Sequence, residues 1–407
     1  MKRRDLIKYL SVAPIAGAAV GTGIPFAAEA AEAAPAKAKR DVIKELGLRT
    51  FINAAGTYTT MTASLMHEEV VDTINESAKH FVMINEVQDK VGEKIAAICH
   101  AESAMVTAGC WSALVLGTAG VLTRMDRKKV GLLPDVSTFD KNEVIVQTSH
   151  NVGYVHALTN TGIKPVVVTT AEELERAIGP KTAMMYFLNA VAPEGKIQHQ
   201  EFVAIAKKHN IPTLIDIAAD IPPVENLWKY TDMGFDLTCI SGGKAIRGPQ
   251  SAGLLIGKKD LIAAARLSAP PSGGNIGRGM KVNKEEILGM YVALDKYVNQ
   301  DHDKEWKEWE AQVATITSAV KKVNGVNAVV SVPEIANHTP KIAISWDQSK
   351  VKATPRQIMK NLQDGSPSIE TMGGRDTIDI TVFMLKPGEE KIVAKRLQEE
   401  LSRAAVS

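Results

Sequence analysis

The chain has 407 residues, of which 45% are hydrophobic and 23% are charged. This composition indicates a globular protein with a large core, built as two lobes, and it excludes disorder for most of the chain. The formal net charge is only +2, and no basic block with interleaved aromatic residues occurs, which argues against a nucleic-acid partner.

The first forty residues differ from the rest of the chain. A basic start containing Arg3 and Arg4 is followed by a moderately apolar run over residues 9–26 and by small-x-small patterns over residues 28–33. This arrangement predicts a twin-arginine-type signal peptide over residues 1–30 and a linker over 31–40. A membrane anchor is the alternative, but proline and glycine interrupt the apolar run. We therefore expect a periplasmic or secreted protein that meets the twin-arginine export machinery in transit.

Between residues 42 and about 278, short β-branched or apolar runs alternate with helical patterns. Such alternation is typical of an α/β domain whose parallel strands are joined by helical crossovers. The expected strands are the seven runs 104–107, 144–147, 165–168, 183–188, 213–217, 237–240 and 253–256. The sequence therefore predicts a large, doubly wound, mostly parallel seven-stranded sheet.

Helical patterns separate these strands, at residues 68–80, 87–99, 113–123, 171–177 and 201–209. A turn-rich break over 270–274 precedes a long helical stretch from 284 to about 323, a shorter βαβ-like region and a last helix over 388–402. We expect a large domain over residues 41–278 and a small C-terminal α/β domain over 279–407.

Lys244 follows two glycines in a turn between two apolar strands. A lysine held at the mouth of a sheet, with Arg247 nearby, loses part of its hydration, which favours the neutral amine that attacks a carbonyl. This setting indicates a lysine that forms a Schiff base with pyridoxal phosphate. An ordinary loop lysine is the alternative.

Asp216 is a carboxylate near the end of the otherwise apolar strand 213–217. A buried carboxylate is costly unless a cation pairs with it, and a protonated pyridine ring is such a cation. A helix cap or a turn residue is the alternative role.

The run 106–113 predicts a phosphate-binding turn, because a strand ends there at small residues and a helix begins. Free backbone N–H groups at a helix N-terminus bind phosphate. Thr107 precedes this turn, and Gly109 and Cys110 supply amides. Ser241 adds a hydroxyl, and Arg247 adds charge unless it serves the substrate instead.

His150 follows the strand 144–147 and is the candidate for stacking on the cofactor ring, with His156, Tyr154 and Trp111 as alternatives. Asn189 follows the strand 183–188 and is the candidate to hydrogen-bond the phenolic oxygen of the cofactor. All these residues follow strand ends in sequence order, where ligands bind in open α/β sheets.

Several segments then resemble a known family, namely 51–59, 241–250, 253–254, 275–281 and 284–286. They are similar to the selenocysteine synthase-related pyridoxal-phosphate enzymes of fold type I, above all to the D-glucosaminate-6-phosphate ammonia-lyase branch. The similarity spans roughly residues 41 to 400. It implies the aminotransferase fold, a homodimer or higher homo-oligomer, Lys244 as the internal aldimine and proton shuttle, and Asp216 on the pyridine nitrogen.

The resemblance also implies an α,β-eliminating ammonia-lyase that acts on a small amino acid or amino sugar acid. The signal peptide and the missing basic footprint separate the chain from the tRNA-dependent members of the family. A racemase, an aminotransferase and a non-catalytic exported binding protein of the same fold remain alternatives.

For substrate binding the candidates are Arg375, Arg278 and Thr57. Arg375 has the bidentate geometry that suits a carboxylate, although an arginine in a surface turn is an equal alternative. Arg278 is a second candidate, either for substrate or for the cofactor phosphate of a neighbouring subunit. The three cysteines form no CxxC pair, so we expect no metal and no disulfide.

Overall fold

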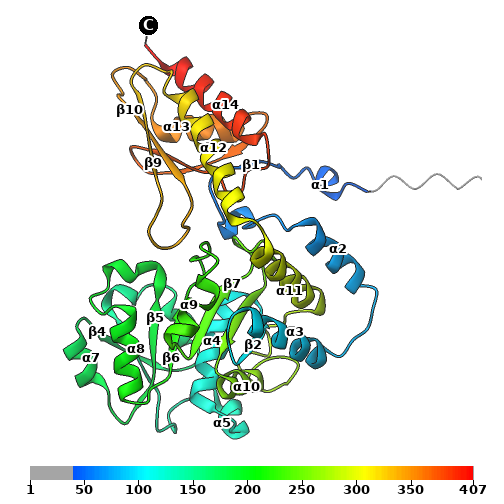
Figure 1. The fold of residues 1–407 in the computed structure, drawn as a ribbon, viewed down its shortest axis with the longest axis vertical. Coiled ribbons are helices and arrows are strands. Elements are labelled where there is room, and N and C mark those ends of the chain that lie inside the picture. Colours follow the sequence, from blue (N-terminus) through cyan, green and yellow to red (C-terminus); the bar gives the residue numbers. More distant parts are fainter. Residues whose placement is uncertain (1–39, 407) are drawn as a thin grey trace, which may run out of the picture. The chain divides into compact units, whose positions relative to one another are not determined.

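A computed structural model describes residues 40–406 (Figure 1). The predicted signal peptide and all of the linker except Arg40 therefore lie outside the described residues. Helix α1 (Val42–Glu45) belongs to a first unit that ends at Arg49, and the second unit begins at Thr50. The side chain of Asp41 caps α1 by accepting the N–H of Lys44 at 3.1 Å.

The second unit contains the seven-stranded sheet, in the order β2-β8-β7-β6-β5-β3-β4. Its strands are β2 (Ser103–Thr107), β3 (Glu143–Gln147), β4 (Lys164–Val168), β5 (Thr182–Leu188), β6 (Thr213–Asp216), β7 (Leu237–Ser241) and β8 (Gly253–Gly257). All seven predicted strands are present, to within one residue at each end. Only β8 runs antiparallel to its neighbours β2 and β7, so the sheet is mostly parallel, as expected.

Both faces of this sheet are covered, because successive side chains of a strand point to opposite faces. In β5, Met185 and Phe187 join one hydrophobic cluster, whereas Met184 and Tyr186 join the other. The first cluster also receives side chains from α3 (Ile84–Ile98), α8 (His199–Lys208) and α11 (Lys284–Asn299). The second receives them from α4 (Gly109–Thr123), α6 (Val155–Thr159) and α10 (Lys259–Leu267). The doubly wound architecture is thus confirmed.

Other helices join or flank these elements. They are η1 (Thr59–Met61), α2 (Glu68–Ser77), α5 (Arg127–Leu132), η2 (Thr148–His150), α7 (Ala171–Ala177), η3 (Asn189–Glu194) and α9 (Asn226–Met233). The helix expected over 113–123 begins four residues earlier, at Gly109, so that its first turn forms part of the loop after β2.

A four-stranded sheet lies in the C-terminal part, in the order β12-β13-β10-β9. Its elements are β9 (Val326–Ser331), β10 (Lys341–Trp346), β12 (Met372–Gly373) and β13 (Ile378–Thr381), packed with α12 (His302–Val320), α13 (Pro355–Asp364) and α14 (Glu389–Ala404). Short strands β1 (Ile52–Asn53) and β11 (Ile369–Glu370) pair in parallel beside it. The expected βαβ-like order is wrong for β9 and β10, because no helix joins them and they form an antiparallel hairpin.

The helical stretch expected from 284 to about 323 consists of two helices, since Asp301 caps a new helix, α12, by accepting the N–H of Lys304 at 2.9 Å. Helix α11 packs into the cluster of the large sheet, while α12 packs into that of the small sheet. The packing therefore places the division between the domains after α11, later than the expected residue 278. Ile52, although early in the chain, belongs to the small-sheet cluster.

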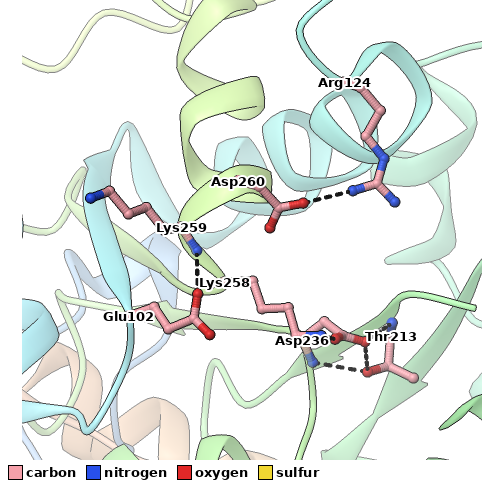
Figure 2. A network of polar contacts seen from close by, with 7 residues as sticks. All are labelled: Glu102, Arg124, Thr213, Asp236, Lys258, Lys259 and Asp260. Atoms are coloured by element: carbon pink, nitrogen blue, oxygen red, sulfur yellow. Dashed lines mark hydrogen bonds and ion pairs between the residues drawn. The ribbon is translucent and has the colours of Figure 1, made fainter. Parts of the chain in front are cut away.

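A polar network closes the edge of the large sheet at which β6 and β7 begin and β8 ends (Figure 2). Asp236 accepts the backbone N–H of Thr213 at 2.8 Å and its hydroxyl at 2.9 Å, and it pairs with Lys258 at 2.8 Å. Arg124 pairs with Asp260 at 3.1 Å. Both of these residues, together with Asp236 and Lys258, line one cavity of about 270 Å³. These mutually satisfied charges stabilise the edge.

Within residues 40–406, no helix combines the length and the apolar character needed to cross a membrane. The same part of the chain holds no cluster of His, Cys, Asp and Glu side chains suited to a metal ion. Cys99, Cys110 and Cys239 are all buried free thiols.

Candidate active site

The predicted site residues meet at the edge of the large sheet opposite to the network of Figure 2. Thr107 and Ser241 lie on either side of Gly253, because both pair with it in the strand register. Asp216 pairs in register with Cys239 of β7 on one side and lies opposite the end of β5 on the other. Five adjacent strands thus bring the phosphate turn, the aspartate and the lysine loop together.

Lys244 is half-buried in the loop between β7 and β8. Gly242 donates its N–H to Ala252 at 2.9 Å, which closes the base of the loop. A Cβ at Gly242 would lie 2.2 Å from the sulfur of Met290, and one at Gly243 would lie 2.5 Å from the Cα of Gln250. Only glycines allow this close approach, so the Gly-Gly pair holds the lysine at a fixed place on the sheet edge.

An early segment of the chain covers this loop. The hydroxyl of Ser64 donates to the carbonyl of Gly243 at 2.8 Å, and the Nε of Arg247 donates to the carbonyl of Leu65 at 2.8 Å. Thr57 is half-buried a few residues earlier in the same segment. Burial lowers the pKa of Arg247, and the nearby charge of Glu305 opposes that shift. The loop is therefore held from two sides, by the sheet and by this segment.

Asp216 is only 2% exposed, and its one close hydrogen bond in the described structure comes from the N–H of Ala218 at 2.9 Å. The thiol of Cys110 lies 3.6 Å from Oδ1 and the hydroxyl of Tyr186 lies 3.5 Å from Oδ2. Burial raises the pKa of Asp216, while the charge of Lys244 lowers it. A buried carboxylate so weakly satisfied fits a cationic partner such as a protonated pyridine.

The turn after β2 fits a phosphate. Gly109 begins α4 at a φ of 79°, a left-handed conformation that favours glycine, and no side chain caps this helix in the described structure. The hydroxyl of Thr107 donates to the carbonyl of Gly109 at 2.9 Å. A Cβ at Gly253 would lie 2.6 Å from the N of Cys110, so glycine is needed there too. The first amides of α4 are left for an anion.

His150 is completely buried, which contradicts a stacking role for its ring. Its Nδ1 accepts the N–H of Leu188 at 3.2 Å, and its ring lies edge-on to Phe187 at 4.4 Å. Burial lowers the pKa of His150 to about 4, so the ring is a neutral core group. Trp111, one of the alternatives, lies on the first turn of α4 and is 40% exposed, edge-on to His156.

Asn189 is buried behind the end of β5, where its Oδ1 accepts the Nε2–H of His199 at 2.6 Å. Burial lowers the pKa of His199 to about 4, so this neutral ring carries its proton on Nε2. The amide nitrogen of Asn189 is then free to face Asp220 and Tyr230, and its presence lowers the pKa of both groups. Asn189 therefore lies close to the expected cofactor position but is oriented by His199.

Asp220 is a second buried carboxylate close to Asp216 in sequence, and sequence reasoning missed it. It is 2% exposed; its Oδ1 accepts the N–H of Ala336 at 3.1 Å, whereas its Oδ2 is buried without a hydrogen-bond partner. Burial raises the pKa of Asp220 to about 7; the charge of Asp216 raises it further and that of Lys244 lowers it. The available signal was a second carboxylate four residues after Asp216, within an apolar stretch.

The two arginines predicted to bind substrate are both exposed, and neither is bonded to the Lys244 loop in the described structure. Arg375 is exposed in the turn between β12 and β13, and Arg278 is exposed in the segment after α10. Among residues 40–406, no hydrogen bond or ion pair joins either side chain to the Lys244 loop. Their roles in substrate binding stay predictions.

This arrangement of sheet, lysine, buried aspartate and phosphate turn defines a pyridoxal-phosphate-dependent enzyme of fold type I. Residues 33–289 match the family model "Aminotransferase class-V", and the chain belongs to that family. The expected cofactor and fold class are confirmed.

Curated relatives agree with the expected branch. The chain is 31% identical over 268 residues to D-glucosaminate-6-phosphate ammonia lyase of Salmonella typhimurium, covering 63% of this chain and 70% of that protein. It is 24% identical over 375 residues to 5'-C-glycyluridine monooxygenase-decarboxylase of a Streptomyces species, covering 88% and 91%. A selenium transferase for L-seryl-tRNA(Sec), from Moorella thermoacetica, is 22% identical over 47% of this chain and 39% of its own length.

Among solved structures, that of a D-glucosaminate-6-phosphate ammonia-lyase superposes with a TM-score of 0.78 and 26% identity. The match covers 90% of this chain and all of that chain. The similarity therefore includes the small domain as well as the large sheet.

Proposed function

We propose that this chain is a lyase that removes ammonia from a small 2-amino-3-hydroxy acid or amino sugar acid. The observation that carries the proposal is the similarity to an ammonia-lyase over 90% of the chain, together with a site that keeps a lysine, a buried aspartate and a phosphate turn. Pyridoxal phosphate, when bound, supplies the electron sink that makes the Cα–H bond of an amino acid acidic.

Each protein group has a stated task in this proposal. Lys244 would hold pyridoxal phosphate through its Nζ and would act as the base that removes the proton from Cα of the substrate. The carboxylate of Asp216 holds the positive charge on the pyridine nitrogen. The turn at Gly109 and the hydroxyl of Ser241 hold the phosphate, and Trp111 covers one face of the ring.

The chemistry balances without an oxidant. The Cα–H and Cβ–O bonds break, and the proton held on Lys244 leaves with the hydroxyl as water. The resulting enamine takes up a proton from solvent at Cβ, and a water molecule then replaces ammonia at Cα. The products are a 2-oxo acid and ammonia.

The test is to incubate the protein with pyridoxal phosphate and a panel of 2-amino-3-hydroxy acids, and to assay ammonia and 2-oxo acid together. Equal amounts of both products are expected from at least one compound. Colour without product from every compound would count against elimination. The panel includes phosphorylated and unphosphorylated amino sugar acids, so that it tests whether the enzyme requires a phosphate group on its substrate.

An aminotransferase is the second candidate, favoured by the family model that the chain matches. Dependence of turnover on an added 2-oxo acid would identify it. A racemase would incorporate deuterium at Cα from heavy water with no net product.

A homo-oligomer belongs to the same proposal. Large apolar side chains are exposed in the early part of the chain on both sides of α2, including Leu65 at 55%, Phe81 at 106% and Met83 at 73%. A second copy of the chain would remove them from water. Sedimentation of the wild type and of a Phe81→Asp variant tests this, with dissociation expected for the variant.

Export by the twin-arginine route is a further part of the proposal, motivated by Arg3 and Arg4. Replacing both arginines with lysine is expected to retain the protein in the cytoplasm of a bacterial host, as measured by fractionation. An unchanged periplasmic yield would contradict the proposed route.

A further inference from the structure

Asp216 ends β6 and Asp220 lies four residues later, in the turn that follows, and only Asp216 has an assigned task. Both carboxylates are buried, and contacts on two sides hold Asp220. The Nδ2 of Asn226 donates to its carbonyl at 2.6 Å, and the N–H of Ala336 donates to its Oδ1 at 3.1 Å. Asn226 thus fixes the backbone of Asp220, Ala336 fixes one carboxyl oxygen, and Oδ2 is left unsatisfied.

The contact with Ala336 comes from the loop between β9 and β10, which reaches from the small sheet toward the large one (Figure 1). The N–H of Asn337 also donates to the carbonyl of Ala219 at 2.7 Å. A role in anchoring this loop needs only backbone groups and Oδ1. It gives no reason for a second, unpaired carboxyl oxygen in a dry place, where such an atom is costly.

The groups that act on Asp220 are the groups assigned to the cofactor. The charges of Asp216 and Lys244 and the amide of Asn189 all change the pKa of Asp220, although Asn189 is not within hydrogen-bond geometry of Oδ2. Tyr230 of α9 is the other titratable group that faces it, and the charge of Asp220 raises the pKa of that phenol. Asp220 also follows Asp216 by only four residues, at the end of the sheet that carries the Lys244 loop and the phosphate turn.

We infer that Asp220 is a cofactor-binding residue whose Oδ2, in the protonated carboxyl, donates a hydrogen bond to the phenolic oxygen of bound pyridoxal phosphate. The ring has two polar atoms of its own, and Asp216 takes the nitrogen, so the oxygen is left for Asp220. A carboxyl whose pKa is raised to about 7 can hold that proton at neutral pH, and a nearby phenolate would favour the protonated form further. The inference rests on the proposed assignment of Lys244 and Asp216 to the cofactor.

The experiment is a pH titration of the visible absorption of the Lys244-linked cofactor in the wild type, in Asp220→Ala and in Asp220→Asn. The carboxyl proton of Asp220 stabilises the phenolate form of the ring oxygen, which lowers the pKa of the protonated link; alanine removes this donor, whereas asparagine keeps one. The midpoint is therefore expected to rise by about one to two pH units in Asp220→Ala, as for the loss of one hydrogen bond to a charged group. In Asp220→Asn the midpoint is expected to stay close to that of the wild type.

Asn226→Ala is the matched control, because it loosens the same turn without removing the carboxyl group. A purely structural role for Asp220 predicts equal midpoints in wild type, Asp220→Ala and Asn226→Ala, and that result would overturn the inference. If Asp220→Ala does not fold, Asp220→Leu, which also lacks a donor, replaces it with the same expectation.

The outcomes separate this inference from the proposed function. A colourless wild type would contradict the link at Lys244. A yellow wild type that releases no ammonia would contradict the lyase while leaving the titration to decide the role of Asp220.

Discussion

Asp216 ends β6 at one edge of the seven-stranded sheet. Asp236 directly precedes the neighbouring strand β7, at the opposite edge. Asp236 accepts two hydrogen bonds from Thr213 and pairs with Lys258. Asp216 is buried with one close hydrogen bond in the described structure. The same residue type on the same sheet is thus fully satisfied at one edge, and is held by one close and two long hydrogen bonds at the other. The contacts of Asp236 stabilise the fold, whereas Asp216 is left able to pair with a charged ring.

Replacing the lysine at each edge with alanine is expected to give the largest difference in activity. Lys244→Ala removes the covalent link and the base, so activity should fall by about a thousandfold or more, and borohydride should fix no cofactor. Lys258→Ala is the control, because it removes a lysine that only pairs with Asp236. It should keep its colour and lose about 1 kcal/mol or less of stability, measured by urea unfolding. Colour retained in Lys244→Ala after dialysis would contradict the assignment.

The two glycines that begin and end β8 provide the next contrast. A Cβ at Gly253 would lie 2.5 Å from the carbonyl carbon of Gly109, and one at Gly257 would lie 2.0 Å from the carbonyl oxygen of Asp236. Alanine at either site should destabilise the apo protein by about 2–4 kcal/mol, since the clash is with backbone. Only Gly253→Ala should also weaken cofactor binding, raising the dissociation constant about tenfold or more in a fluorescence titration. Equal cofactor affinities in the two variants would remove the distinction between the edges.

The aspartates test the comparison directly. Asp236→Ala leaves the N–H and hydroxyl of Thr213 without their acceptor, so the free energy of unfolding should fall by about 2–3 kcal/mol. Asp216→Asn keeps an acceptor for Ala218 and removes a buried charge, so the apo protein should lose less than about 1 kcal/mol. Its activity should nevertheless fall by about a hundredfold. A large loss of apo stability in Asp216→Asn would mean that this carboxylate is structural.

The smallest effect is a pH dependence at Asp220. Its folded pKa is raised to about 7 by burial, above its unfolded value, so its contribution to stability is present at low pH and is lost as pH rises toward 7. Asp220→Asn removes that loss. The apo variant should therefore gain stability relative to wild type as pH rises from 5 to 7, by about 2 kcal/mol in total. A difference independent of pH would show that Asp220 does not titrate in this range.

Much of the fold and of the site follows from local pattern. Strand ends were predicted to within one residue because β-branched and apolar runs bounded by turn residues report burial directly. Lys244 was identifiable because two glycines and two apolar strands surround it in sequence. The order of candidates along the chain also placed Thr107, Asn189 and Asp216 at one edge.

The misplaced assignments share a cause. His150 has the position of a ring that stacks on a ligand, but contacts with Phe187 and Leu188 enclose it in the core. Helix α11 has the pattern of the small domain's helical stretch, yet its apolar side packs on the large sheet. A sequence pattern reports that a side chain is buried and does not report what covers it.

The sequence by itself determined the strands, the lysine loop and the phosphate turn, because each depends on residues within a few positions of one another. The tertiary structure alone decided which buried carboxylates have partners. Asp236 is satisfied by Thr213, 23 residues away, and Asp220 is held at one oxygen by Ala336, 116 residues away. Whether a buried polar atom is paired depends on such distant segments, so the free oxygen of Asp220 becomes visible only in the folded chain.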